Sequence, residues 1–464
     1  MLEKIRHFHF VGIGGSGMSA IAKVLLEKGY VVSGSDMSAS EMTQKLARLG
    51  AKIFAQHQAE NIAGAEALVV STAIAAANPE IVAAKAAGIP VYHRSDLVAA
   101  LMNQRTGIAV AGAHGKTTTT SMIALMMEHG GLDPAVIIGG ELDYIKGNAK
   151  WGNGRFLVAE ADESDGSFLK FAPKVAVVTN IENDHMDYYH TMENVLQAFR
   201  TFLQNLSPVD GLAVVCLDNE HVRDLLPEVR ARCLTYGLQP GADYTACNLR
   251  TNGAQTLYDI HHKGKNLGTM RLHVPGEHNV LNSLAAVIVG LESGLTFEQI
   301  VDGMGHFYGA KRRFQTKARL NGVWIVDDYA HHPTEIISTL AAARQTEAGR
   351  LICVFQPHRF SRTQLLLREF GGAFSNCDVV ILTDIYAAGE APRTGVSGEV
   401  LRQEVERQLE RPIVYIPERE KIARYLAETA ESGDLIMTMG AGDIYRTGEE
   451  LIELLTAKQP AGGN

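Results

Sequence analysis

The 464-residue chain lacks several features that mark whole classes of protein. No apolar stretch reaches the roughly 18 residues needed to cross a bilayer, so we expect no membrane insertion. The first residues run into a glycine-rich loop without an apolar signal segment, which predicts a cytoplasmic protein. The net charge of −9 argues against a general nucleic-acid binder, because such proteins carry a net basic face. A site for phosphates would therefore need positive charge concentrated locally.

Cysteine is also scarce. The five cysteines are odd in number and scattered, and none forms a CxxC pair. This pattern indicates neither a disulfide framework nor a zinc site. We expect reduced thiols packed as small apolar side chains.

Short apolar runs alternate with helical segments along most of the chain, which predicts an α/β protein with parallel sheets. The length is too great for one ordinary core, and three α/β units in tandem are the simplest account. Between residues 245 and 274 the pattern changes to two strands around a turn at Lys263–Asn266. This predicts an antiparallel hairpin attached to the second unit.

The strongest local motif is Gly112-Ala113-His114-Gly115-Lys116-Thr117, between an expected strand and an expected helix. Backbone N–H groups in such a loop converge on phosphate oxygens at the positive end of the helix dipole. Lys116 is then expected at the β- and γ-phosphates, and the Thr117 hydroxyl at Mg²⁺. Val110 stands where the usual P-loop has its first glycine, so this loop is shorter. An ordinary glycine turn before a helix is the alternative.

A second glycine loop, Gly12-Ile13-Gly14-Gly15-Ser16-Gly17, follows the first expected strand. Asp36 ends the next strand, nineteen residues after Gly17. This is the dinucleotide-binding pattern, in which the acidic residue reaches a ribose hydroxyl. It indicates a nucleotide diphosphate on a helix N-terminus, and UDP, NAD or FAD would all fit.

Carboxylates follow two further expected strands. Glu160, Asp162, Glu163 and Asp165 come after the strand 156–159, and the segment 179–187, which contains His185, follows the strand 175–178. Carboxylates at the carboxyl end of parallel strands beside a P-loop are candidates for Mg²⁺ ligation or water positioning. A solvated acidic turn is the alternative for the first segment alone.

Polar residues also end the expected strands of the third unit, at 327–333, 356–362, 384–386 and 440–443. Such residues at the carboxyl edge of a parallel sheet indicate a crevice. Its arginines suit a transferring phosphoryl group or a substrate carboxylate. The His331-His332 pair lacks a third ligand at metal spacing, so zinc is not favoured.

Seven motifs in order resemble the Mur ligase family: GAHGKTTTT, AEADESD, TNIENDHMD, PGEHNVLN, DDYAHHPTE, QPHRFSRT and MGAGDI. The resemblance covers nearly the whole chain. It implies a Rossmann-like domain for a UDP-sugar, a central P-loop domain with a small antiparallel sheet for ATP, and a Rossmann-like domain for an amino acid. The expected boundaries are 1–105, 106–316 and 317–464. It also implies activation of a carboxylate by ATP as an acyl phosphate, which an amine attacks.

The resemblance assigns a role to each matching residue. The residues expected to bind ATP are Gly112, His114, Gly115, Lys116, Thr117, Thr118, His278, Asn279, Arg313 (or its neighbour Arg312), Asp328 and Tyr329. Those expected to bind the substrates are Gly12, Gly14, Gly15, Ser16, Gly17, Asp36, Ser71, His332 and His358. Thr117, Glu160 and His185 are expected to hold Mg²⁺, and the catalytic residues are expected to be Lys116, Glu160, His185, Arg359 and Arg362. The separate roles of Asp162, Glu163 and Asp165 stay open.

Family members that add the second and third amino acids carry a carbamylated lysine after the Asp-His pair. No lysine occurs here from Asp184 to Pro208, which resembles the branch that joins L-alanine to UDP-N-acetylmuramate. With ATP and Mg²⁺, that reaction is the expected function, in a monomer or weak homodimer. Two alternatives stay open. A ligase that joins the same UDP-sugar to a preformed tripeptide would differ mainly in the third domain. A nicotinamide-dependent oxidoreductase would rest only on the first glycine loop and Asp36.

Overall fold

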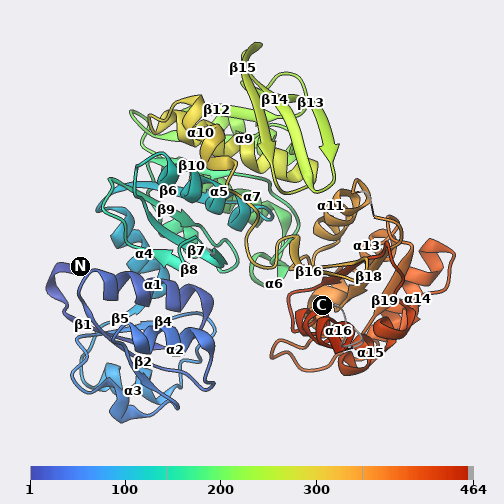
Figure 1. Ribbon diagram of the computed structural model, residues 1–464. Coiled ribbons are helices and arrows are strands. Elements are labelled where there is room, and N and C mark those ends of the chain that lie inside the picture. The colour runs from blue at the N-terminus through green and yellow to red at the C-terminus, as the bar shows by residue number, and fades with distance from the viewer. Residues whose placement is uncertain (1, 143, 347, 458–464) are drawn as a thin grey trace, which may run out of the picture. The chain divides into compact units, whose positions relative to one another are not determined.

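The computed structural model describes residues 2–142, 144–346 and 348–457 and contains three β-sheets, of five, ten and six strands (Figure 1). Each sheet occupies its own stretch of sequence, so the α/β class and the three-domain architecture are confirmed. The expected boundary at 316/317 falls inside β16 (Gln315–Leu320), and the domain limits stay a prediction. By compactness the chain divides into two units. The first unit holds 1–248, 258–270 and 281–307, and the second holds 249–257, 271–280 and 308–464.

The first sheet is entirely parallel, with the order β3-β2-β1-β4-β5. Its elements are η1 (Leu2–Lys4), β1 (His7–Val11), α1 (Ser16–Glu27), β2 (Val31–Ser35), α2 (Glu41–Arg48), β3 (Lys52–Phe54), η2 (Ala59–Ile62), β4 (Ala67–Val70), α3 (Pro79–Ala86), β5 (Val91–His93) and α4 (Arg94–Met102). Phe8 and Phe10 pack into the core that includes residues of α1 and α4. His9, between them, points to the other face, where its Nε2 lies 3.4 Å from Glu80 of α3.

The second sheet has the order β15-β14-β13-β12-β11-β10-β6-β9-β7-β8. Its strands are β6 (Thr106–Ala111), β7 (Ala135–Leu142), β8 (Gly147–Lys150), β9 (Phe156–Glu160), β10 (Val175–Val178), β11 (Leu212–Cys216), β12 (Arg232–Gly237), β13 (Tyr244–Asn252), β14 (Gln255–His262) and β15 (Lys265–Leu272). The connecting helices are α5 (Lys116–His129), η3 (Ser167–Lys170), α6 (Met186–Tyr189), α7 (Met192–Gln204), α8 (Glu220–Leu225), η4 (Leu226–Glu228), α9 (Glu277–Glu292) and α10 (Phe297–Met304).

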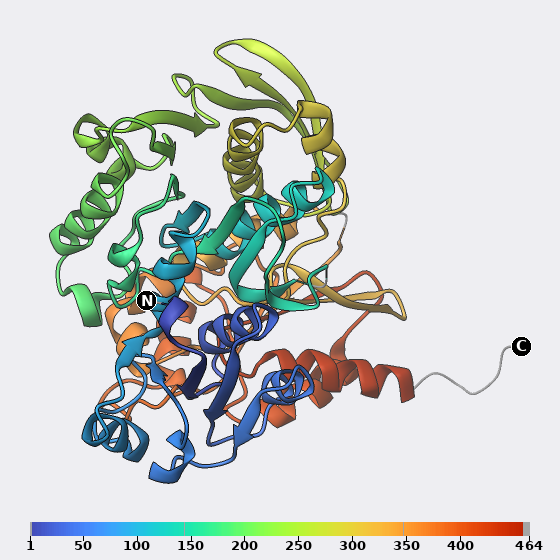
Figure 2. The same cartoon turned by 90° about the vertical axis from the view of Figure 1, so that its left-hand side faces the viewer.

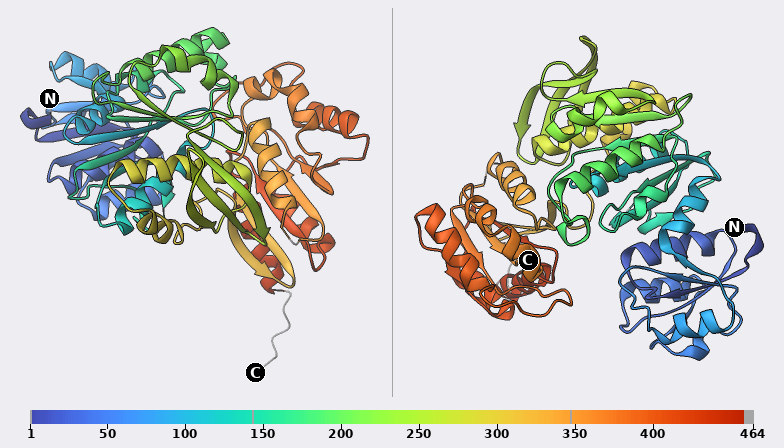
Figure 3. Two further views of the ribbon diagram at one scale, coloured as in Figure 1. Left: turned by 90° about the horizontal axis from the view of Figure 1, so that it is seen from above. Right: turned by 180° about the vertical axis from the view of Figure 1, so that it is seen from behind.

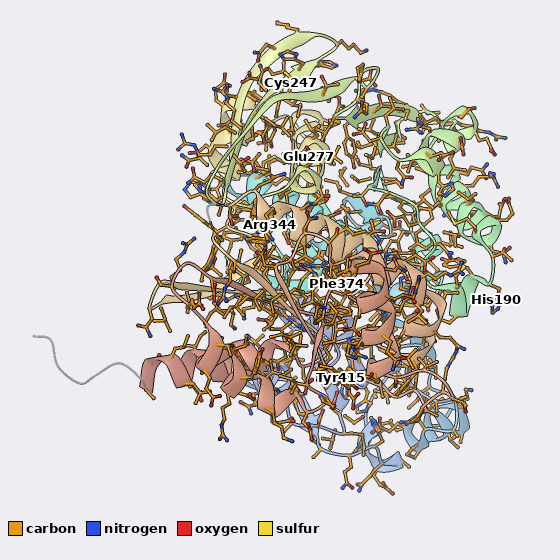
Figure 4. The ribbon with its side chains drawn as sticks, turned by 90° about the vertical axis from the view of Figure 1, so that its right-hand side faces the viewer. His190, Cys247, Glu277, Arg344, Phe374 and Tyr415 are labelled. Atoms are coloured by element: carbon orange, nitrogen blue, oxygen red, sulfur yellow. The ribbon has the colours of Figure 1, made fainter. Side chains whose placement is uncertain are left out.

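The expected hairpin is confirmed in β14 and β15. Its two loop residues, Lys263 and Gly264, have φ of 48° and 81°, and two successive positive φ angles match the twist of a tight hairpin. With β13, which carries Cys247, these strands form a curved ribbon at the end of the sheet (Figures 2 and 4).

The third sheet has the order β16-β17-β21-β18-β19-β20, and only the pairing of β16 with β17 is antiparallel. Its elements are β16, β17 (Val323–Asp328), α11 (Pro333–Arg344), β18 (Leu351–Phe355), α12 (Phe360–Leu365), α13 (Leu367–Gly372), β19 (Val379–Leu382), α14 (Gly398–Leu409), β20 (Val414–Tyr415), α15 (Arg419–Thr429), β21 (Leu435–Met439) and α16 (Tyr445–Ala457).

Successive residues of each buried strand in this third sheet enter different cores. Phe355 packs with Phe370 and Phe374, whereas Val354 packs in the core that holds residues of α15 and α16. Helices therefore cover both faces of the sheet (Figure 3), and Phe374, labelled in Figure 4, lies in the turn after α13 on one of these faces.

The segment 112–117, called the phosphate loop below, follows β6, and a parallel strand flanks β6 on each side. Val110 pairs with Glu160 of β9, and Ala111 pairs with Val178 of β10. The loops after β6, β9 and β10 consequently leave the sheet side by side, as the sequence predicted. Across the described ranges, no helix is long and apolar enough to cross a membrane.

Candidate active site

The phosphate loop after β6 depends on two glycines. Gly112 has φ of 137°, and a Cβ there would lie 2.0 Å from Thr179 Oγ1. Gly115 has φ of 82°, and a Cβ there would lie 2.5 Å from Asn282 Oδ1. Both positions therefore require glycine. Because α5 begins directly after this loop, its first N–H groups lie at the end of the helix that favours anions.

The segment after β10 holds the loop in place. Thr179 Oγ1 donates to His114 O at 2.6 Å, and Asn180 Nδ2 donates to the same oxygen at 3.0 Å. His114 N donates to Asn180 Oδ1 at 2.8 Å. The sequence placed both residues in a polar segment without giving them a role. Nothing in the sequence around Thr179 and Asn180 indicates that these residues contact a loop 65 positions earlier in the chain.

The Lys116 side chain is only 14% exposed, and its ammonium contacts the loop and one carboxylate. Nζ donates to Gly112 O at 2.5 Å, to Ala113 O at 3.0 Å and to Glu163 Oε1 at 2.6 Å. Burial by itself would lower the pKa of Lys116, but Glu163 more than offsets this, and the pKa is raised. The lysine is therefore a fixed positive charge beside the loop.

Thr117 and Glu160, both expected at Mg²⁺, lie together. Thr117 Oγ1 is 3.1 Å from each carboxylate oxygen of Glu160, and Gly139 N donates to Glu160 Oε2 at 2.7 Å. The structure thus brings Thr117, the second residue of α5, next to the end of β9.

The structure separates the three carboxylates whose roles stayed open. Asp162 Oδ2 accepts from Arg94 Nη2 at 2.6 Å. Burial raises the pKa of Asp162, but Arg94 and a hydrogen bond from Ser164 bring it down to about 2. Asp165 accepts from Thr72 Oγ1 at 3.2 Å and lies 3.7 Å from His93. Only Glu163 of the three contacts Lys116.

His185 lies on the other side of Glu163. It precedes α6 with a left-handed φ of 57°, and its Nε2 is 3.4 Å from Glu163 Oε1 and 3.6 Å from Asp184. Burial lowers the pKa of His185, yet Glu163 and Asp184 raise it further, so the net shift is upward. The expected pairing of His185 with Glu160 stays a prediction, because the contact found here is with Glu163.

The donors in this region fit Mg²⁺. They comprise the hydroxyl of Thr117 and the carboxylates of Glu160 and Glu163, which are the hard oxygen ligands that Mg²⁺ prefers. Glu163 Oε2 is buried and has no hydrogen-bond partner among the described residues. A cation would supply the missing partner for that oxygen.

The glycine loop of the first sheet meets the second sheet. Ser16 Oγ donates to Gly139 O at 2.5 Å, and Asn148 Nδ2 donates to Ser16 O at 2.8 Å. Arg94 Nη1 lies 3.1 Å from the position of a Cβ on Gly17. Arg94 thus contacts both this loop and Asp162. Sequence reasoning missed it, because one arginine at a helix start follows no pattern.

Asp36 contacts the glycine loop itself. Its Oδ2 accepts from Gly14 N at 2.8 Å, and a Cβ on Gly14 would lie equally close to that oxygen. Ser71 O accepts from Ile74 N at 3.1 Å, and the Ile74 side chain lies 3.1 Å from the position of a Cβ on Gly12. The loop after β4 therefore borders the glycine loop, as a binding role for Ser71 would require.

In the second unit, the residues predicted to bind ATP gather near Glu335. Asp328 accepts from Phe314 N at 2.7 Å and from Ala330 N at 2.8 Å, and burial raises its pKa to about 6. Arg313 lies 3.6 Å from Glu335, with its guanidinium 5.4 Å from the Tyr329 ring centre. Burial and the charge of Arg313 lower the pKa of His278 to about 4.

Arg312 and Asn279, also considered as ATP ligands, make hydrogen bonds within the protein. Arg312 Nε donates to Asp327 at 2.9 Å, and Nη2 donates to Gly440 O at 2.6 Å. Asn279 Nδ2 donates to Pro275 O at 2.7 Å. Arg312 thus holds the end of β21, and Arg313 is the better of the two candidates for binding ATP.

The residues predicted to hold the amino acid surround His358. Arg362 Nη1 lies 3.4 Å from His358 Nδ1, and the rings of His358 and Tyr386 stack with centres 5.7 Å apart. Burial and the neighbouring Arg362 and Arg359 lower the pKa of His358 to about 4, so the imidazole is neutral at pH 7. Arg359 has φ of 69° at the start of α12. Tyr386 lies in the segment 384–386 that the sequence placed at this edge of the sheet, without a role of its own.

His332 caps the neighbouring helix. Its Nδ1 accepts from Thr334 N at 3.4 Å at the start of α11, where Glu335 completes a capping box. His332 is therefore held at the N-terminus of α11, next to Glu335.

Comparison with known proteins matches three family models along the chain. The Mur ligase family catalytic domain matches residues 7–106, the Mur ligase middle domain matches 110–290, and the Mur ligase glutamate ligase domain matches 312–442.

Similar proteins cover the full length. A UDP-N-acetylmuramate–L-alanine ligase of Pelotomaculum thermopropionicum is 51% identical, with 99% of this chain and 100% of the relative covered. One of Geobacter sp. strain M21 is 50% identical at the same coverage. The crystal structure of a UDP-N-acetylmuramate-alanine ligase from Thermotoga maritima superposes with a TM-score of 0.84 at 28% identity, covering 98% of this chain and 100% of that one.

Proposed function

The chain belongs to the Mur ligase family, and we propose that it joins L-alanine to the lactyl carboxylate of UDP-N-acetylmuramate. ATP is converted to ADP and phosphate, and the carboxylate passes through an acyl phosphate. The observation that carries the proposal is the identity of about half of all residues, over the full length, with relatives of that name.

The geometry supports the first step, transfer of the γ-phosphoryl group to the carboxylate. A carboxylate is a poor electrophile, because its charge repels nucleophiles and oxide is a poor leaving group. Phosphorylation brings two anions together, the substrate carboxylate and the ATP phosphates, so fixed positive charge must already be in place. Lys116 and the N-terminus of α5 supply it at the phosphate loop. Mg²⁺ held by Thr117, Glu160 and Glu163 would neutralise further negative charge as the phosphoryl group transfers.

Glu163 has a second part in this step. Its Oε1 contacts both Lys116 and His185, so one carboxylate sets the position of both side chains. Lys116 can exchange the carbonyls of Gly112 and Ala113 for phosphate oxygens while it keeps Glu163 as its counter-ion. The lysine is thereby oriented before the nucleotide arrives.

The second unit supports the attack by the amino acid. Arg359 and Arg362 beside His358 provide the charge that would hold the L-alanine carboxylate bidentately. Neutral His358 adds no positive charge that would repel the incoming amine. The proposal keeps the binding roles that the sequence assigned to the remaining residues. ATP is bound by Asp328, Tyr329, Arg313, His278 and Asn279. The substrates are bound by His332, Gly12, Gly14, Gly15, Ser16, Gly17, Asp36 and Ser71. The cytoplasmic location and the monomer or weak homodimer also belong to the proposal.

Phosphate release tests the proposal directly. The chain is incubated with UDP-N-acetylmuramate, ATP and Mg²⁺, and release with L-alanine is compared with release with the tripeptide. We expect phosphate release that depends on L-alanine. Release that depends on the tripeptide and not on L-alanine would instead establish the ligase that joins this UDP-sugar to a preformed tripeptide. Lys116→Ala should reduce turnover by about 10²–10³-fold, whereas Lys174→Ala, in a surface ion pair with Asp210, should not. Near-normal turnover in Lys116→Ala would contradict the role of the loop.

A further inference from the structure

Three potential metal ligands gather at the end of α5 opposite to the phosphate loop. His129 is the last residue of α5, Asp302 lies in α10, and His306 follows α10. All three are exposed, and one ligand atom from each lies within 4.8 Å of the others. Thirteen residues separate His129 from Lys116, which places the group about 20 Å along the helix from the phosphate loop.

One imidazole is already oriented as a ligand. His306 Nδ1 lies 2.9 Å from Asp302 O, a carbonyl that can only accept, so Nδ1 carries the proton. The lone pair of His306 is therefore on Nε2. A backbone carbonyl on one ring nitrogen is the usual device that fixes the tautomer of a metal-bound histidine. The His129 ring stacks on that of His306, with centres 4.2 Å apart and planes inclined by 17°.

Close helix packing fixes the backbone positions of these ligands. A Cβ on Gly303 of α10 would lie 2.9 Å from Met126 Cα and 3.4 Å from His129 Cβ. A Cβ on Gly130 would lie 2.4 Å from the Leu295 side chain. Gly303 thus lets α10 approach α5 closely, and Gly130 lets the end of α5 approach the segment before α10, so side-chain rotation is the main adjustment left to the site.

The local field also favours a cation. Both α5 and α10 end here, and each helix C-terminus carries partial negative charge from its last carbonyl groups. Asp302 adds a carboxylate beside these carbonyl groups. A divalent ion satisfies all of these groups together.

We propose that His129, Asp302 and His306 bind a divalent transition-metal ion of the Zn²⁺ class, with water as the remaining ligand. Two imidazoles and one carboxylate suit Zn²⁺ rather than Mg²⁺. Ligand atoms in tetrahedral Zn²⁺ sites lie about 3.3 Å apart, so the exposed side chains close by rotation. The bound ion links the C-terminal ends of α5 and α10 and does not take part in the ligase reaction.

Calorimetric titration of the full chain with Zn²⁺, in excess Mg²⁺, tests this site. The wild type should bind one equivalent more than His306→Ala and than His129→Ala. His190→Asn is the matched control: His190 is an exposed histidine on the loop after α6 (Figure 4), with a positive φ of 65°, and asparagine is enriched among the non-glycine residues with positive φ. This control should bind as the wild type does.

A spectroscopic signal identifies the ligands. One equivalent of Cu²⁺ should give an electron paramagnetic resonance spectrum with nitrogen hyperfine structure in the wild type, and this structure should be lost in His129→Ala/His306→Ala. Both single variants should keep normal phosphate release without added Zn²⁺, which shows that they fold. Equal Zn²⁺ stoichiometry in the wild type and both variants would overturn the proposal.

Discussion

Replacing Glu163 by glutamine should destabilise the first unit, because it removes the counter-ion of a buried lysine. The side chains of Lys116 and Glu163 are 14% and 3% exposed, and their charged atoms are 2.6 Å apart. Loss of one partner from a buried pair costs roughly 3–5 kcal/mol. The amide oxygen of glutamine can still accept from Lys116 Nζ, so we expect the lower limit, about 3 kcal/mol. For a urea m-value near 3 kcal/mol per molar, the unfolding midpoint falls by about 1 M.

The chain has two tryptophans, Trp151 in the first unit and Trp324 in the second. In a Trp324→Phe background, urea unfolding followed by fluorescence therefore reports the first unit alone. Glu228→Gln is the matched control, because Glu228 is 45% exposed in its 2.8 Å pair with Arg200. Its cost should stay below about 1 kcal/mol. If Glu163→Gln shifts the midpoint no more than this control does, the buried pair is not the stabilising contact inferred here.

Three further predictions concern other regions. Gly112→Ala should abolish phosphate release, whereas Gly29→Ala, at an open turn with a positive φ of 86°, should keep it; activity in Gly112→Ala would show that the loop can move away from Thr179. Burial raises the pKa of Glu80, but hydrogen bonds from His9 and other partners lower it below its ordinary value. Its stabilisation is therefore present above the unfolded pKa and lost as pH falls through the folded one, so the urea midpoints of wild type and Glu80→Gln should converge in acid; a constant difference would count against this. Small-angle scattering should show compaction when ATP analogue and UDP-sugar are both added, because the predicted ligands lie in two units; an unchanged radius of gyration would contradict closure.

The sequence predicted the parts of the site that follow local rules. A strand, a glycine loop and a helix follow one another at Gly112 in a fixed order, and glycine is needed where φ is positive. The carboxylates after β9 were placed correctly at the edge next to the phosphate loop, because parallel strands end on the same side. The hairpin at Lys263 followed from turn chemistry in the same way.

Contacts between distant segments could not be predicted in this way. Arg94 meets Asp162 across 68 positions, and nothing in either local pattern pairs them. His9 sat in a correctly predicted strand, yet its neighbour Glu80 comes from a helix far along the chain. Consecutive carboxylates in a loop have no periodicity to separate their directions, so only the fold could distinguish Asp162 from Glu163.

The fold divides the acidic segment between two tasks. Asp162 holds Arg94, and Asp165 contacts Thr72 and His93, so both carboxylates join the first sheet to the second. Glu160 and Glu163 face the phosphate loop instead.

A single glycine, Gly139, links the glycine loop after β1 to the loop after β6. Gly139 O accepts from Ser16 of the first loop, while Gly139 N donates to Glu160, which contacts Thr117 of the second. A side chain at Gly139 would lie 2.9 Å from a Glu160 oxygen, so this strand cannot approach Glu160 as closely with any other residue. Because Gly139 is bonded to both Ser16 and Glu160, we expect movement of the loop after β1 to displace the strand that positions Glu160. On the proposed roles, in which the loop after β1 binds the UDP-sugar and Glu160 binds Mg²⁺, binding at either site is therefore expected to order the other.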